Sequence, residues 1–495
     1  MLKMNSFLMR TSVGDKRGEV LPPTFLVFVG TMLLALLLGV TLGLTGSYVF
    51  AIVIGAGIMA ITLLLRQDEW LVALLLMIRL YVDWYLGLGV VALVLLIVVL
   101  TIYFIFRIPR FTLKIHDLLW IWILLLTIAV IPAIRGVSLS DGAYYYFNII
   151  FYAFIMFYLG AILIGNIGSF KRLLKALSFS SIFIAVITII QAVTGKLWFG
   201  STRYDTYLTS IGNYPLSSDV TIFRVGSFFV NPNSSGAFFA MMLLLPLGLF
   251  FESSTFLGKA VYFIEIIILL PALAFSYSTG AWLSLCIGLV VFMIFVGQVY
   301  YRILLLLIVA GFTMTLVTVF PSQVVLQLQH AEAPAGLLLR SGAWQTGIQV
   351  IRAFPLLGLG LGRYVYILRA EPYRVITQYR PLDHPQDSFL ELAAFGGLPV
   401  ALVFISLLLL AFWLAVRNWF RSDVKARSLI AGGIASATAL TVYSLSDAGW
   451  TLTPLLALGW LILGATSTLA EGQAELRNVE KGKTSNEPNK VEAIL

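Results

Sequence analysis

The sequence predicts an all-α, polytopic integral membrane protein with 12–14 transmembrane helices and two long external loops that contain interfacial helices. The first observation behind this is composition: of the 495 residues, 60% are hydrophobic and only 11% are charged. Soluble globular proteins carry about 45–50% apolar and roughly 25% charged residues. The chain lacks the polar side chains to cover a water-facing surface. A soluble enzyme, a disordered protein and a nucleic-acid-binding domain are therefore excluded.

The second observation is a series of apolar runs, each near the roughly 20 residues that a helix needs to cross the hydrocarbon core. Very short joints at Thr45-Gly46, Gly87 and Ser276–Thr279 leave the count at 12 to 14, because a neighbouring pair could form one re-entrant element. The first run is too long for a signal-peptide core and reads as a retained helix. The runs are 25–44, 47–65, 70–86, 88–106, 117–134, 147–164, 173–193, 235–251, 259–275, 280–297, 302–320, 388–416, 428–446 and 451–469.

The third observation is the distribution of the net charge of +9. Lys and Arg concentrate in the short cytoplasmic loops of membrane proteins. With the amino terminus inside, the cytoplasmic segments hold 21 Lys and Arg against 12 Asp and Glu. Both termini are then cytoplasmic, and the net charge reports orientation rather than a polyanionic partner such as nucleic acid.

This orientation defines seven segments. The two long loops are rich in aromatic residues, which favours function over disorder, whereas the charged tail is predicted to be disordered. The segments are a cytoplasmic amino-terminal segment (1–24), amino-terminal spans (25–193), a first external loop (194–234), central spans (235–320), a large external loop with the catalytic candidates (321–387), carboxy-terminal spans (388–469) and a disordered cytoplasmic tail (470–495).

The external basic residues are almost all arginine. Guanidinium binds phosphate oxygens through a rigid fork of donors, whereas ammonium acts as a point charge. The bias suits a phosphate or diphosphate held at the membrane surface, although single arginines also pair with lipid headgroups or loop carboxylates. The nine arginines and one lysine are Arg135, Lys196, Arg203, Arg224, Arg340, Arg352, Arg363, Arg369, Arg374 and Arg380.

Metal and cofactor chemistry have little support. Cys286 is the one cysteine, and only three histidines occur, so neither a disulfide framework nor a multi-histidine zinc centre is expected. We expect no cofactor.

The large external loop opens with a helical pattern. Leu337, Arg340, Trp344, Ile348 and Ile351 recur at spacings of three and four, which predicts an amphipathic helix at the membrane interface. The segment Pro355-Leu-Leu-Gly-Leu-Gly-Leu-Gly-Arg363 follows. Its glycines would let backbone N–H groups approach an anion, but the spacing matches no nucleotide-binding signature.

Two further motifs lie beside predicted spans. The segment from Arg224 to Asn233 ends in Asn231-Pro-Asn233. Taken alone, this motif predicts only the capped start of a helix. His384 lies in Asp-His-Pro-Gln-Asp, and its imidazole could accept the proton of an attacking hydroxyl. Asp383 and Asp387 are close enough in sequence to orient it, although a lone interfacial histidine is more often structural.

Charges inside the predicted spans are a separate set of candidates. Arg79 and Asp83 lie four residues apart on one helix, and Glu265 lies in another span. Intramembrane charges are functional candidates. If the protein were a transporter, Glu265 would be its proton-coupling residue.

Three blocks in this order resemble the O-antigen ligase and polymerase family of bacterial membrane glycosyltransferases. They are Arg224 to Asn233, Arg340-Ser-Gly-Ala-Trp344 to Gly362, and His384 to Pro399. The resemblance covers about residues 220–415, and the first 190 residues match only as apolar spans.

The resemblance implies a function. Family members transfer a glycan from a polyprenyl diphosphate carrier to a hydroxyl, with inversion and without metal, on the outer face of the bacterial cytoplasmic (inner) membrane. The expected partners are this lipid-linked glycan donor, a glycan or lipid-linked acceptor, the lipid bilayer and other polysaccharide assembly proteins. The product would be O-antigen or exopolysaccharide, and polymerase and ligase activities both stay open.

The resemblance also suggests residue roles. Arg224 and Arg340 match the arginines that bind the diphosphate, with Arg363 as a further candidate, and His384 matches the region of the proposed base. Many relatives have a second histidine where this chain has Gln386, so His384 or Asp387 would have to act as the base. Asn231, Asn233, Trp344 and Gln386 are the expected supporting residues.

Two alternatives come from other classes. A transporter or flippase for lipid-linked sugars would depend on Arg79, Asp83 and Glu265 instead of the external loops. A non-catalytic scaffold of a polysaccharide assembly complex gains weight from Gln386.

Overall fold

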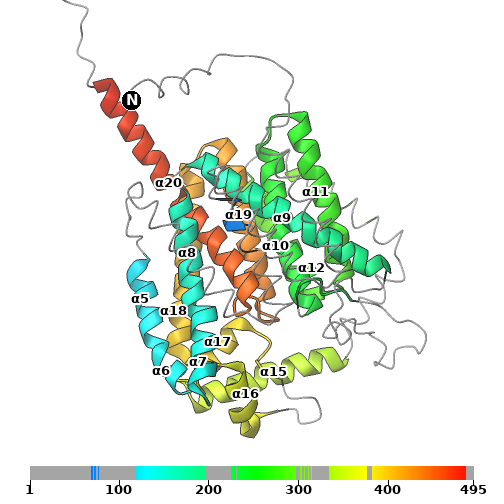
Figure 1. Ribbon diagram of the computed structural model, residues 1–495, viewed down its shortest axis with the longest axis vertical. Helices are drawn as coiled ribbons and strands as arrows, with labels where there is room; N and C mark the ends of the chain where they lie inside the picture. Colours follow the sequence, from blue (N-terminus) through cyan, green and yellow to red (C-terminus); the bar gives the residue numbers. More distant parts are fainter. Residues whose placement is uncertain are drawn as a thin grey trace, which may run out of the picture. The chain divides into compact units, whose positions relative to one another are not determined.

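In the residues that it describes, the computed structural model contains helices joined by loops and no strand, which confirms the predicted all-α class (Figure 1). The described residues belong to the compact unit 61–495, whereas the second unit, residues 1–60, lies outside them. They are 69–70, 72–73, 76, 118–164, 166–194, 224–229, 231–296, 302–303, 306, 310, 314, 334–375 and 382–485, without the side chains of 163, 334–339 and 470–485.

Within this part of the chain, five helices are long and apolar enough to cross a membrane, which confirms a polytopic membrane protein. They are Leu139–Ile162, Ile167–Thr194, Pro232–Glu252, Phe256–Phe275 and Leu398–Arg421, with shorter apolar helices at Leu119–Ile134, Thr279–Phe295 and Thr453–Leu469. The predicted spans 25–44, 47–65 and 88–106, and most of 70–86 and 302–320, lie outside the described residues.

The first described helices correspond to the predicted spans 117–134, 147–164 and 173–193. The middle one begins earlier than predicted, because Ser138 caps it by accepting a hydrogen bond from Asp141 N, and it contains a π-helical segment. The elements are α5 (Leu119–Ile128), α6 (Val130–Ile134), α7 (Leu139–Tyr145), η2 (Tyr146–Phe151), α8 (Tyr152–Leu163) and α9 (Ile167–Thr194).

The central spans are α10 (Pro232–Glu252), α11 (Phe256–Phe275) and α12 (Thr279–Phe295). Each begins at a polar cap, where the side chain of Asn231, Thr255 or Ser278 accepts a backbone N–H from the first turn. The short joint before Thr279 therefore separates two helices.

The predicted span 388–416 is wrong as a single helix. It consists of α17 (Ser388–Gly396) and α18 (Leu398–Arg421), which meet at Gly397. Gly397 has φ of 83°, and an added Cβ would lie 2.2 Å from the Leu356 carbonyl oxygen. The break is thus fixed by backbone geometry that L side chains rarely adopt, which hydropathy does not report.

The predicted tail also needs a correction. After α19 (Val424–Tyr443), helix α20 runs from Thr453 to Ser485, well into the segment 470–495 predicted to be disordered. Ala, Glu, Gln, Arg and Lys make up much of that segment, and all are strong helix formers. Residues 486–495 lie outside the described part.

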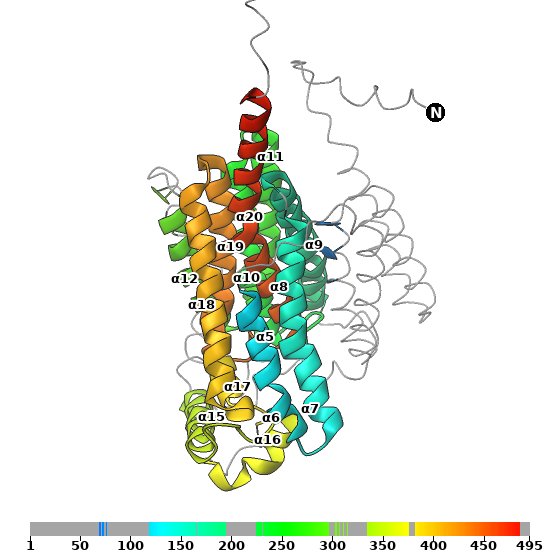
Figure 2. The ribbon, with the colours of Figure 1, turned by 90° about the vertical axis from the view of Figure 1, so that its left-hand side faces the viewer.

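The predicted amphipathic helix is present as α15 (Pro334–Ala353), followed by α16 (Arg363–Arg369) and the short helix η4 (Glu371–Tyr373). Figure 2 shows α15 and α16 with α6, α7 and α17 at one end of the helical bundle. We call it the loop end. The segments predicted to be external meet there: Arg224 contacts Ser276, Asn233 contacts Asp447, and Arg369 contacts Arg135.

Helix α10 is the centre of the bundle. Nearly all of its residues are buried, and it packs against α9, α11, α12 and α19. It approaches α19 closely because glycines face each other: a Cβ on Gly248 would lie 2.8 Å from the Ser428 carbonyl oxygen, and one on Gly432 would lie 2.9 Å from that of Leu244. Small residues allow such close approach between membrane helices. This contact lies near the carboxy-terminal end of α10, away from the loop end, and holds α10 and α19 close together there.

We expect Gly432→Ala to destabilise the protein by about 1–3 kcal/mol, because overpacking a close contact forces a backbone shift. Gly168→Ala is the matched control, since its added methyl meets only side-chain atoms, the nearer being Asn166 Oδ1 at 3.1 Å. It should cost less stability than Gly432→Ala, because a side chain shifts more readily than packed backbone. Thermal unfolding in detergent measures both. A Gly432→Ala protein as stable as the control would contradict the proposed role of this contact.

Candidate active site

Arg224 and Asn233 connect the first external loop to the bundle. Arg224 Nε donates to the carbonyl oxygen of Ser276 at 3.1 Å, and its Nη2 donates to Asn233 Oδ1 at 2.5 Å. Burial lowers the pKa of Arg224 to about 10, and nearby Arg340 adds to this, so Arg224 is still a cation at neutral pH. Among the described residues, no carboxylate forms an ion pair with it.

Asp447 lies at the centre of the site, in the turn between α19 and α20. Its Oδ2 accepts hydrogen bonds from Asn233 Nδ2 at 3.2 Å and from the Tyr443 hydroxyl at 3.0 Å. Its Oδ1 accepts from Ala448 N at 2.7 Å and faces His384 Nε2 at 3.6 Å. Burial opposes ionisation, but His384 and the hydrogen bonds outweigh it and lower the pKa of Asp447 to about 2.

His384 is buried between two carboxylates. Its Nδ1 lies 2.7 Å from Asp383 Oδ1, and its Nε2 faces Asp447 at a distance too long for a hydrogen bond. Burial and Arg363 favour the neutral imidazole, yet the two carboxylates outweigh them and raise the pKa of His384 to about 9. The free protein therefore holds His384 as an imidazolium at neutral pH, and Nε2 has no hydrogen-bond partner among the described residues.

Arg363 sits at the start of α16 between Asp383, which also contacts His384, and a third carboxylate, Glu391. Its Nη1 lies 3.5 Å from Asp383 Oδ2, and its Nε lies 3.6 Å from Glu391 Oε1. Although burial favours the neutral form, these carboxylates raise the pKa of Arg363 above its ordinary value. Glu391 is held in turn by the hydroxyls of Tyr145 at 3.0 Å and Thr451 at 2.7 Å.

Arg340 projects from α15 toward the same place. It is half-buried and close enough to lower the pKa of Arg224. No ion pair joins it to a carboxylate within the described ranges. Two cations without carboxylate partners, Arg224 and Arg340, thus stand together beside the pair formed by His384 and Asp447.

Two of the predicted residues, Asn231 and Asp387, have structural contacts instead. Asn231 caps α10 through Asn233 N at 2.9 Å. Asp387 caps α17, accepting from Phe389 N at 2.7 Å and from Leu390 N at 2.9 Å, and burial raises its pKa. The orientation of His384 comes from Asp383 and Asp447, so the expectation that Asp387 orients it is wrong.

Trp344 and Gln386 hold the histidine loop against α15. Trp344 Nε1 donates to the Gln386 carbonyl oxygen at 3.2 Å. Gln386 has φ of 59°, a conformation that is uncommon for residues other than glycine. Its contribution shown here is through the backbone, next to the histidine.

The central amides of the glycine segment are engaged in backbone hydrogen bonds and are not free to bind an anion. The amides of Leu359, Gly360 and Leu361 donate to the carbonyl oxygens of Ala394, Phe395 and Pro132 at 2.9–3.0 Å. The glycines allow close backbone packing between α17 and the α6–α7 turn, and this packing holds Arg363 at the site.

Sequence reasoning missed Asp447, Glu391 and Tyr443 as site residues. One sequence feature could have identified Asp447. It is the lone charged residue in the short connection 447–450 between two predicted spans, on the same predicted side of the membrane as His384. Contacts over more than 200 residues, such as Asn233 to Asp447, are not encoded in local patterns.

The remaining candidates lie elsewhere. Arg79 and Asp83 are outside the described residues. Glu265 is buried in α11, where it accepts a hydrogen bond from Ser178 of α9, away from the loop end. Within the described residues, no group of three or more His, Cys, Asp or Glu side chains could hold a metal ion.

The comparison with known families agrees with this part of the chain. Residues 264–405 match the family described as O-antigen ligase, which confirms the resemblance over that region. The matched region holds Arg340, Arg363, Asp383, His384 and Glu391, and it stops short of Asp447. It supports a glycosyl-transferring membrane enzyme of bacterial polysaccharide assembly, with lipid-linked glycans as substrates. No curated protein matches the chain.

The raised pKa of His384 predicts a pH-dependent stability. A folded pKa of about 9 against an unfolded value near 6.5 means that the stabilisation is complete below about pH 6.5 and is lost as the pH rises through 9. The unfolding temperature should therefore fall between pH 7.5 and 10, and His384→Gln should flatten that fall. An equally steep fall in His384→Gln would show that another group titrates.

Proposed function

We propose that this protein is an inverting glycosyltransferase that moves a glycan from a polyprenyl diphosphate carrier to a hydroxyl on the outer face of the bacterial cytoplasmic membrane. One observation carries the proposal. Two arginines that have no carboxylate partner among the described residues, Arg224 and Arg340, lie beside the buried pair of His384 and Asp447. Both termini are then cytoplasmic, and the loop end is the external end. Polymerisation and ligation use the same donor and differ in the acceptor.

Arg224 and Arg340 are the proposed diphosphate ligands. Negative charge grows on the departing diphosphate, and preorganised donors in a site of lowered dielectric stabilise it. Arg224 is held in position by neutral partners, the Asn233 amide and the Ser276 carbonyl, so its charge is still available to an anion.

Arg363 supports the site in a different way. Because Asp383 and Glu391 already offset its charge, we propose that it positions these carboxylates more than it binds the diphosphate. Through Asp383 it also fixes the Nδ1 side of the His384 ring. Asp387 and Asn231 act by capping the helices that carry the site.

The acceptor hydroxyl is proposed to lie at His384 Nε2, the nitrogen that has no hydrogen-bond partner among the described residues. Its oxygen attacks the anomeric carbon as the bond from that carbon to the diphosphate oxygen breaks, and its proton passes to Nε2. Asp447 stabilises the imidazolium that results. Attack opposite the leaving group inverts the anomeric centre.

Removing the side chain of His384 or of Arg340 should abolish most of the glycan transfer. A positioned base typically contributes about 10²–10⁴-fold in rate, and one charge-stabilising donor about 10²–10³-fold. Purified protein reconstituted with a polyprenyl-diphosphate oligosaccharide should lose transfer by these factors in His384→Ala and Arg340→Ala, respectively.

Arg352→Ala is the matched control for the second variant, because Arg352 is exposed on the same helix α15. It should retain wild-type transfer. Unchanged turnover in His384→Ala and Arg340→Ala, with folding intact, would contradict the site assignment. Glycan movement across the bilayer without a new glycosidic bond would favour a flippase instead.

The pH profile tests the role of His384 directly. A base must be neutral, and the free protein holds the pKa of His384 at about 9. The kcat/KM for transfer should therefore rise about tenfold per pH unit from 7 and level near 9. If kcat/KM instead falls through pH 9, His384 acts as a cation at the diphosphate and another group takes the proton.

A further inference from the structure

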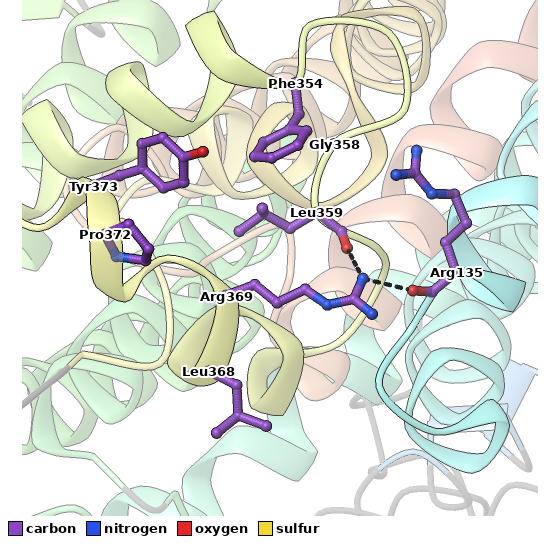
Figure 3. Close-up of a pocket in the computed structure, with 8 residues that line it drawn as sticks. All are labelled: Arg135, Phe354, Gly358, Leu359, Leu368, Arg369, Pro372 and Tyr373. Atoms are coloured by element: carbon purple, nitrogen blue, oxygen red, sulfur yellow. Dashed lines mark hydrogen bonds between the residues drawn. The ribbon is translucent and has the colours of Figure 1, made fainter.

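A pocket of about 500 Å³ lies at the loop end, separate from the His384 cluster (Figure 3). This volume is within the range of about 300–1,000 Å³ that is usual for small-molecule sites. Four segments build it: the turn after α6, Phe354 at the end of α15, the glycine segment, and the end of α16 with η4. The lining residues are Arg135, Phe354, Gly358, Leu359, Leu368, Arg369, Pro372 and Tyr373.

One side of the pocket carries two guanidinium groups. Arg369 Nη1 donates to the carbonyl oxygens of Leu359 at 2.7 Å and of Arg135 at 2.8 Å, which fixes its head in place. The Arg135 side chain is exposed. Neither arginine forms an ion pair with a carboxylate in the part of the chain that the structure describes. Glu371, which precedes Pro372, is paired with Arg374, so its charge is already offset.

The other side is aromatic. Phe354 and Tyr373 form an edge-to-face pair with ring centroids 5.8 Å apart, and Figure 3 shows them across the pocket from Arg135. Aromatic rings offer a rigid apolar surface with a polar handle at the tyrosine hydroxyl. A flat ligand with an apolar face and an anionic group fits this combination.

The pocket is linked to the proposed reaction centre by helix α16. Arg363 at the start of this helix contacts the His384 cluster, whereas Arg369 at its end lines the pocket. Six residues of α-helix separate the two backbone positions by about 9 Å. A glycan engaged at His384 could therefore extend into the pocket.

We propose that this pocket binds a carboxylate-bearing sugar of the glycan substrate. Arg135 and Arg369 would hold the carboxylate, and the Phe354–Tyr373 pair would stack on the sugar face. The inference rests on the proposed function for the identity of the ligand. It adds a preference for acidic over neutral glycans that the reaction centre does not itself predict.

Direct binding tests the pocket without requiring transfer. The probes are tetragalacturonic acid and its fully methyl-esterified form, which share one sugar skeleton and differ in charge. The full chain in phosphatidylcholine nanodiscs should bind the acid at least about tenfold more tightly than the ester, since hydrogen bonds to charged groups contribute this much.

Arg135→Ala should remove this preference, raising the Kd for the acid about tenfold and leaving that for the ester unchanged. The side chain is exposed, so folding should be unaffected. Arg352→Ala, an exposed arginine outside the pocket, should bind both probes as the wild type does. Tyr373→Ala should raise the Kd for both probes by the same factor, because stacking on the aromatic rings does not depend on the charge of the probe.

Two results would overturn the inference: equal Kd values for acid and ester, or an Arg135→Ala protein that keeps the preference. A third result would assign the pocket to a lipid headgroup instead. In that case phosphatidylglycerol in the nanodiscs would abolish acid binding by the wild type, and it would no longer change the Kd of the Arg135→Ala protein for the acid. His384→Ala should bind the acid normally. Acid binding without any transfer by the wild type would contradict the proposed function and leave the pocket standing.

Discussion

The loop end depends on the buried carboxylate of Asp447. An isolated charge in such a place would cost several kcal/mol, and the structure offsets this cost with Asn233, Tyr443, Ala448 N and the facing His384. Asn233 and His384 come from distant parts of the chain, whereas Tyr443 and Ala448 are neighbours of Asp447 in sequence. One side chain therefore ties the start of α10, the histidine loop and the α19–α20 turn together. Helices α10 and α19 pack side by side, which places Asn233 and Asp447 at the same end of the bundle.

Backbone strain gathers around this centre. Among the described residues other than glycine, positive φ occurs at Ser227, Tyr277 and Gln386. Each lies within three residues of a group at the site: Arg224, the Ser276 carbonyl that Arg224 contacts, and His384. Such conformations persist only where the surroundings hold them, and they cluster at functional sites. The loops at this end are therefore fixed in place by their contacts, which is what a preorganised electrostatic site requires.

Sequence patterns predicted the helices well and the site in part. The apolar runs identified the spans, and the spacing of apolar residues at three and four identified α15, because both patterns report local burial. The motifs also selected Arg224, Arg340 and His384, which the structure brings together at the loop end. They could not separate Asp383 from Asp387, since equal distance in sequence says nothing about which carboxylate caps a helix. Asp447 was missed because its contacts to Asn233 and His384 join residues far apart in sequence.

The arginines in the segments predicted to be external divide into two groups according to the groups that hold them. Arg363 and Arg374 have carboxylate partners, so their charge is offset and their role is to fix loops. Arg224 and Arg369 are held by neutral oxygens, and Arg135 and Arg340 have no carboxylate partner within the described residues. A guanidinium positioned by neutral groups keeps its charge for an incoming anion, at little further cost in side-chain entropy. In the proposed function, two such pairs, Arg224 with Arg340 and Arg135 with Arg369, form two separate anion-binding subsites, one for the diphosphate and one for an acidic sugar.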